Sequence, residues 1–112
     1  MSNILVADRD QRFRILYHFI LRDHDIYEAS SVSQALEHLQ RQSIDLIVTE
    51  WEFPDGTAQK LLNHVRKCEI PVVLVSLIQD MLPPLPDIVK RRFNKPFSLP
   101  DLRLTVGQML SG

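Results

Sequence analysis

The chain contains only one cysteine and three glycines in 112 residues. The single cysteine, Cys68, excludes an intramolecular disulfide bond and is compatible with a reducing compartment. Because the glycines are isolated, the chain has no glycine-rich loop of the kind that holds nucleotide phosphates. These absences count against a disulfide-stabilised secreted domain and against a nucleotide-binding enzyme.

Long apolar runs and a strong net charge are also absent. No stretch approaches the roughly 20 apolar residues of a membrane span, and the N-terminal residues do not resemble a signal peptide. We therefore expect a cytoplasmic protein without membrane contact. The net charge of −1 does not favour nucleic acid, and we interpret the short basic run Lys90-Arg91-Arg92 as a solvated surface. The length suits one domain spanning residues 1–112.

The sequence alternates between two kinds of segment. Short apolar runs predict strands buried on both faces, as in parallel sheets, at 4–7, 44–49 and 71–76, with weaker runs at 26–29 and 92–94. Amphipathic spacing predicts helices between and after them: one from 10 to about 23 with Asp10 as its N-cap, one over 32–39, one over 61–65, and a last one opened by 98–101.

The alternation breaks where a fourth helix is due. Between Ser76 and Phe93 the chain carries Pro83, Pro84 and Pro86. Proline removes a backbone donor and clashes with the preceding helical turn, so we predict a loop or a single turn here. The remaining pattern predicts a three-layer α/β sandwich with a five-stranded parallel sheet, in which the fourth helix is shortened or replaced by a proline-rich loop.

Charged residues collect at the predicted carboxyl ends of the strands, where α/β proteins bind their ligands. These residues and one serine follow or end the first, third, fourth and fifth strands: Asp8, Arg9, Asp10, Glu50, Ser76 and Lys95.

Four segments, in the order "ILVADRD", "DLIVTEWEFPDG", "PVVLVS" and "NKPF", resemble the successive signatures of response-regulator receiver domains over nearly the whole chain. The resemblance implies a flavodoxin-like (βα)5 fold. It also implies an acidic pair that holds Mg²⁺, a phospho-accepting aspartate after the third strand, a Ser or Thr after the fourth and a Lys-Pro after the fifth. In this family the Lys95-Pro96 peptide is commonly cis.

Several residues depart from the family pattern. Arg9 stands where the family usually has the acid that ligates the metal, and Glu50 stands at the phospho-acceptor position. Arg92 replaces the usual switch aromatic, and Leu77 replaces a small residue. A glutamate reaches about 1.5 Å further than an aspartate, and a guanidinium cannot ligate a cation. We therefore expect a pseudo-receiver without enzymatic activity, resident metal or cofactor, although it keeps Asp8, Asp10, Ser76 and Lys95.

The charges suggest what replaces the metal. We expect Arg9 to pair with Asp8 or Glu50 while Lys95 holds the other carboxylate, with both acids ionised at neutral pH. Glu50 would then be a fixed negative charge, and Trp51 would shield the rim of the site. The alternative is a decayed site whose charges are solvated.

The predicted first helix carries a candidate partner surface. Its core stripe is complete without Ile15 and Phe19, which fall on the opposite flank beside Arg12 and Arg22. In receiver domains this helix commonly docks a histidine kinase or a phosphotransfer domain. The resemblance, together with the departures from the family pattern, thus predicts a phosphorylation-independent protein–protein interaction module in two-component signal transduction or a phosphorelay. A homodimer through an unusual face stays open.

Two other functions stay open. One is a working, Mg²⁺-dependent receiver with a nonstandard site, in which Asp8, Asp10 or Glu52 contributes to the metal. The other is a hydrolase or nucleotide-binding enzyme of flavodoxin-like fold, which the missing phosphate loop and the lack of a strand-end nucleophile with a base disfavour.

Overall fold

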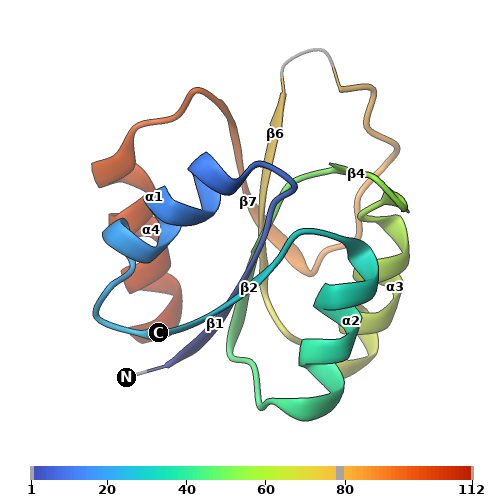
Figure 1. Ribbon diagram of the computed structural model, residues 1–112, viewed down its shortest axis with the longest axis horizontal. Coiled ribbons are helices and arrows are strands. Elements are labelled where there is room, and N and C mark those ends of the chain that lie inside the picture. Colours follow the sequence, from blue (N-terminus) through green and yellow to red (C-terminus); the bar gives the residue numbers. More distant parts are fainter. Residues whose placement is uncertain (1, 78–79, 112) are drawn as a thin grey trace.

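The computed structural model describes residues 2–77 and 80–111. It consists of a five-stranded parallel sheet with helices on both faces (Figure 1). The strand order is β2-β1-β3-β6-β7, and every neighbouring pair is parallel. The strands are β1 (Asn3–Ala7), β2 (Asp25–Ala29), β3 (Leu46–Thr49), β6 (Val72–Leu77) and β7 (Val89–Lys95). This confirms the predicted α/β architecture and the five predicted strands.

Four helices follow the predicted order: α1 (Gln11–Ile20), α2 (Val32–Arg41), α3 (Gln59–Cys68) and α4 (Leu99–Ser111). Asp10 is the N-cap of α1, and its side chain accepts a hydrogen bond from the Arg12 N–H, as predicted. Ser31 caps α2 in the same way through the Gln34 N–H. Helix α1 ends at Ile20, earlier than predicted, and the buried Leu21 continues its apolar face within a turn.

The sheet separates two hydrophobic cores. Leu5 and Ile47 lie in one core with residues of α2 and α3. Ile4 and Val48 lie in the other with residues of α1 and α4. Neighbouring residues of one strand therefore enter different cores, and both are buried because helices cover both faces of the sheet. This is why the strands read as continuous apolar runs in the sequence.

The proline-rich segment between β6 and β7 forms no helix within its described residues, 80–88, as predicted. Residues 78 and 79 of the same predicted loop lie outside the described residues. Leu82, Leu85 and Ile88 pack against the core on the α2 and α3 side. The loop therefore supplies apolar cover where the alternating pattern would place a helix.

The segment between β3 and α3 carries a small hairpin that the sequence did not predict, formed by β4 (Glu52–Phe53) and β5 (Gly56–Thr57). The peptide bond between Lys95 and Pro96 is cis, as the resemblance implied. Among the described helices, none combines the length and hydropathy that a membrane crossing requires.

Candidate functional site

Three charged side chains meet at the carboxyl ends of the strands. Asp8 follows β1, Glu50 follows β3, and Lys95 is the last residue of β7. The Lys95 Nζ lies 2.8 Å from Asp8 Oδ2 and 3.6 Å from Glu50 Oε1. Asp8 is fully buried, and Glu50 is only 4% exposed. We call Asp8, Glu50 and Lys95 the strand-end cluster.

Arg9 closes the open side of this cluster. Its backbone N–H donates a hydrogen bond to Glu50 Oε2, and its Nε lies 3.7 Å from Glu50 Oε1. Because the Arg9 side chain is 45% exposed, water screens its pairing more than that of the buried Lys95. Arg9 pairs with Glu50 and Lys95 contacts Asp8 most closely, as predicted, but Lys95 also contacts Glu50, so it does not hold a single carboxylate.

Two aromatic residues of α1 contact the strand-end cluster. The Tyr17 hydroxyl lies within hydrogen-bonding reach of Asp8 Oδ2, at 3.5 Å, and the Phe13 ring centroid lies 4.0 Å from Lys95 Nζ. Burial and the nearby Asp8 carboxylate raise the pKa of Tyr17 above its usual value, so Tyr17 stays a neutral donor. Phe13 and Tyr17 are four residues apart, about one helical turn, so the sequence places them on one face of α1. It does not show that this face contacts the end of the first strand.

Glu50 is not the fully ionised carboxylate that the sequence suggested. Burial, together with the nearby Asp8 carboxylate, raises the pKa of Glu50 to about 7, and the Arg9 N–H and Lys95 offset only part of this shift. The physical reason is that two buried carboxylates share one buried ammonium. Near neutral pH Glu50 is therefore partly protonated, which corrects the prediction of a fixed negative charge.

Asp10 does not join the cluster. Its side chain accepts hydrogen bonds from the Arg12 Nε at 3.1 Å and the Arg12 Nη2 at 2.8 Å. These bonds hold the pKa of Asp10 at about 2. The Asp10 backbone N–H instead donates to Asp8 Oδ1 at 2.9 Å, which occupies one more oxygen of that carboxylate.

The charged residues do not fit the Mg²⁺ that the family resemblance implies. Mg²⁺ needs several free oxygen ligands in octahedral geometry. Here Asp8 is engaged by Lys95 and the Asp10 N–H, Glu50 is engaged by Arg9 and Lys95, and Asp10 turns toward Arg12. Within residues 2–77 and 80–111, no three His, Cys, Asp or Glu side chains are grouped so that they could hold a metal ion.

The remaining predicted site residues are placed differently. Ser76 is buried near the end of β6, and Leu77 is half-buried, with its N–H bonded to Asp80 Oδ2 at 3.0 Å. Arg92 is exposed on β7. Trp51 was expected at the rim, but it is 5% exposed and packs in the core on the α2 and α3 side. Its apolar ring therefore points into the protein rather than over the site.

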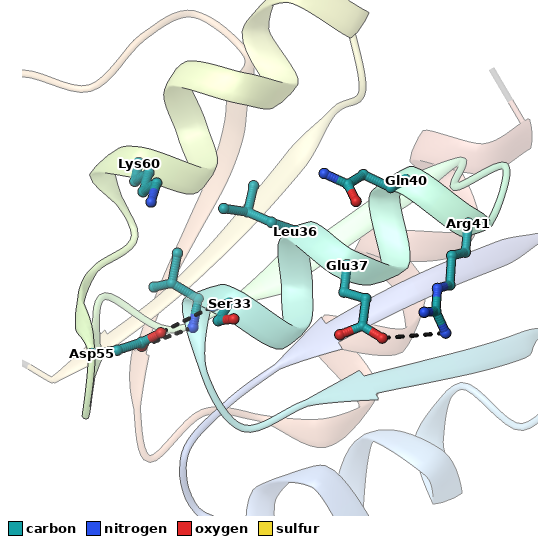
Figure 2. A pocket seen from close by; sticks show the side chains of 8 residues that line it. Ser33, Leu36, Glu37, Gln40, Arg41, Asp55 and Lys60 are labelled. Carbon is teal, nitrogen blue, oxygen red and sulfur yellow. Dashed lines mark hydrogen bonds and ion pairs between the residues drawn. The ribbon is translucent and has the colours of Figure 1, made fainter.

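Asp55 has a structural role that sequence reasoning missed. Its carboxylate accepts hydrogen bonds from the Val32 and Ser33 N–H groups, both at 3.0 Å, and so caps α2 from a distant loop (Figure 2). These bonds lower the pKa of Asp55. Asp55 also borders a cavity of about 470 Å³ that reaches Lys60 of α3 and Arg41 of α2. None of its lining residues belongs to the strand-end cluster.

The predicted partner residues are exposed on α1. Ile15 is 60% exposed and Phe19 is 61% exposed. The Arg22 guanidinium lies 5.0 Å from the centroid of the Phe19 ring, so a cation borders the apolar surface. Phe19 and Arg22 also line a cavity of about 360 Å³ that extends to Leu99 and Pro100 at the start of α4.

No protein-family model matches the sequence. Solved structures match over nearly the whole chain. A response regulator receiver domain protein from Clostridium thermocellum has a TM-score of 0.84 at 19% identity, covering 99% of this chain and 95% of that one. The response regulator TrrA from Thermotoga maritima, solved with Mg²⁺ and BeF, has a TM-score of 0.85 at 21% identity, covering 97% and 99%. The receiver domain of the hybrid histidine kinase CckA has a TM-score of 0.79 at 22% identity, with the same coverage.

The chain has the fold of a response-regulator receiver domain. Its flavodoxin-like sheet places Asp8, Glu50, Ser76 and Lys95 at the strand ends, where the sequence resemblance assigns the receiver site. After β6, the described residues 80–88 form a proline-rich loop.

Proposed function

We propose that this chain is a pseudo-receiver, a cytoplasmic protein-interaction module of two-component signalling that works without phosphorylation and without enzymatic activity. The observation that carries the proposal is the closed strand-end cluster, in which buried Lys95 bridges Asp8 and Glu50 and Arg9 caps Glu50. In a receiver, these positions bind Mg²⁺ and a phosphoryl group. In this protein, their charged side chains pair with one another.

The cluster is poorly suited to phosphoryl transfer. An attacking carboxylate must be ionised and free to approach phosphorus. The pKa of Glu50 is raised to about 7, its side chain is 4% exposed, and it accepts a hydrogen bond from the Arg9 backbone N–H. Its extra methylene also displaces the oxygens relative to an aspartate, and misplacement on the scale of 1 Å costs roughly a hundredfold in a positioned reaction.

The experiment that tests the proposal uses Trp51, which follows Glu50 directly, as a fluorescent reporter. The protein is titrated with Mg²⁺ and then with acetyl phosphate or beryllofluoride, with intact mass measured in parallel. We expect neither a saturable fluorescence change nor an added phosphoryl mass. A matched double variant, Arg9→Asp with Glu50→Asp, restores the family pattern and should gain Mg²⁺ binding. An added phosphoryl mass on the wild-type protein would overturn the proposal.

The same experiment decides the second candidate, a working receiver with a nonstandard site. It is favoured by the retention of Asp8, Ser76 and Lys95 on a receiver fold. Under this reading, Mg²⁺ must displace Lys95 from Asp8, so the fluorescence change would appear at high Mg²⁺ and would be followed by phosphorylation at Glu50.

The partner surface of the pseudo-receiver is the exposed face of α1 around Ile15 and Phe19. Exposed apolar side chains bordered by cations are typical of partner sites, and the adjoining cavity extends this surface to α4. This surface suits a helical partner such as a histidine kinase or phosphotransfer domain.

We expect Phe19→Ala to weaken binding to such a partner about tenfold or more, because truncating an aromatic anchor that is buried in an interface typically costs about 2 kcal/mol or more, and about 1.4 kcal/mol corresponds to tenfold. The measurement is biolayer interferometry against a panel of purified kinase dimerisation domains and phosphotransfer domains. Leu104→Ala is the control, since Leu104 is 62% exposed on α4 and does not line the cavity. Equal loss for both variants would contradict the assignment.

A further inference from the structure

Strand β7 ends the sheet on one side. In the strand order it has β6 as its only neighbour among the described strands, so its outer edge is unpaired there. Every second N–H and C=O group along such an edge points away from the sheet and can pair with another strand. Three consecutive residues of β7, Lys90, Arg91 and Arg92, are exposed. We call these three residues the basic edge.

The cations of the basic edge have no acidic partner in the described part of the chain. None of the ion pairs formed there includes Lys90, Arg91 or Arg92. The Arg91 side chain donates to the Lys90 carbonyl at 2.9 Å, which leaves its charge uncompensated. By contrast, exposed Arg103 on α4 pairs with Asp23 at 2.8 Å.

The register of β7 explains how the cations reach both faces of the sheet. Val72 pairs with Val89 but Val73 pairs with Arg91, so Lys90 is an extra residue in a bulge. After the bulge the pairing is regular from Arg91 through Lys95. Arg91 lies beside Val73, which faces the α1 and α4 core, and Arg92 lies beside Leu74, which faces the other core. Residues 91–95 therefore offer a regular edge with a cation on each face.

The positive charges of the basic edge indicate which kind of strand could pair with β7. A second copy of the chain pairing β7 against β7 would bring like charges together across the two strands, which destabilises the pairing. An extended acidic segment would meet each cation with an opposite charge and would pair with the free backbone groups. We propose that the basic edge binds an acidic segment of a partner protein, which adds to the sheet as a sixth strand along residues 91–95.

This surface is separate from the α1 surface described above, because it involves neither Ile15 nor Phe19. Its test therefore does not depend on the pseudo-receiver proposal. It also differs in kind: the α1 surface suits a helix, whereas the basic edge suits an extended strand.

The test is fluorescence anisotropy with a labelled seven-residue peptide, Val-Glu-Glu-Val-Glu-Glu-Val, which matches the length of β7 and presents carboxylates on both faces of the added strand. We expect saturable binding that weakens with added salt. The double variant Arg91→Glu with Arg92→Glu should bind at least about tenfold more weakly, because two attractive cross-strand pairs become repulsive. The control, Arg66→Glu with Lys67→Glu, makes the same charge change at exposed positions on α3 and should bind like the wild type.

Two measurements on the wild-type protein keep the test independent of how the variants fold. A peptide with proline at its centre keeps the charge but loses the backbone donor, and it should bind much more weakly. Amide hydrogen exchange should slow within residues 91–95 when the acidic peptide is bound. Equal binding of both peptides, tighter binding of a single-stranded oligonucleotide, or no binding at all would overturn the proposal. The last result would leave the basic edge as a guard against aggregation.

Discussion

At the scale of single residues, the protein concentrates its buried charge in two carboxylates and one ammonium. Asp8 is fully buried and Lys95 Nζ lies 2.8 Å from it, while Glu50 shares the same ammonium at 3.6 Å. The two acids therefore have different roles. Asp8 has the closest contact with Lys95 and accepts a further hydrogen bond from the Asp10 N–H. Glu50 is held less closely by Lys95, and burial raises its pKa.

Stability should fall as pH rises through the titration range of Glu50. Its pKa is about 7 in the folded state and 4.5 in the unfolded state. The stabilisation that Glu50 gives to the folded state is therefore fully present below pH 4.5 and is lost as pH rises through about 7. Gln resembles the protonated acid. We expect Glu50→Gln to be more stable than the wild type at about pH 8 and to show a flatter pH profile between about pH 5 and pH 8. Thermal denaturation across this range checks it, and parallel profiles for both proteins would contradict it.

Asp8→Asn should destabilise the protein strongly. Removing one partner of a buried ion pair leaves the other charge uncompensated and typically costs about 3–5 kcal/mol. Here Glu50 can partly compensate Lys95, so we expect about 3 kcal/mol in urea unfolding. Adding Lys95→Met should recover part of the loss, because the buried ammonium is then gone. A double variant as unstable as the sum of its singles would show that the pair is not coupled.

At the scale of elements, loops hold the helices in place. Helix α2 begins with two sets of caps, from Ser31 beside it and from Asp55 in the loop between β3 and α3. The hydrogen bonds of Asp55 therefore connect the segment after Glu50 to the start of α2. A sequence distance of 23 residues separates Val32 from Asp55, so no local motif predicts this contact.

Asp55→Ala should cost about 1 kcal/mol, the usual loss for an N-cap, because two N–H groups of α2 lose their acceptor. Asp55→Asn keeps an acceptor oxygen and should lose less. The lowered pKa of Asp55 means that the charge-dependent part of this stabilisation is present at neutral pH and is lost as pH falls through the folded value, so in acid the wild type should approach Asp55→Asn. Urea unfolding with hydrogen exchange in the first turn of α2 measures the effect; unchanged protection there would contradict it.

At the scale of the whole molecule, the four helices and the strands of the main sheet were predictable, whereas the small β4–β5 hairpin and the ionisation of the site were not. Continuous apolar runs such as 72–75 marked strands covered on both faces, and the prolines correctly excluded a helix over the described residues 80–88. The state of Glu50 depends on burial and on sharing Lys95 with Asp8, a contact between residues far apart in sequence. The inward placement of Trp51 and the cap from Asp55 likewise arise only when distant segments meet.

The loop between β6 and β7 should stabilise the whole domain through its apolar side chains. Leu85 is partly buried against the core on the α2 and α3 side, so Leu85→Ala should lower the free energy of unfolding by roughly 1–2 kcal/mol. Met81→Ala is the matched control in the same loop, since Met81 is 94% exposed and should change little. Chemical denaturation compares the two, and equal effects would show that the loop does not cover the core.

The division of the interior into two cores has a consequence for synthesis on the ribosome. The core on the α2 and α3 side draws its residues from positions 5 to 89 of the chain. The other core needs Leu102 and Val106 of α4 to cover Tyr17 and Ile20 of α1. During synthesis the sheet can cover part of the apolar stripe of α1 before α4 has been made, but α4 must emerge before this core is complete. Although α1 is the first helix to be translated, its burial is therefore finished only when α4 packs beside it.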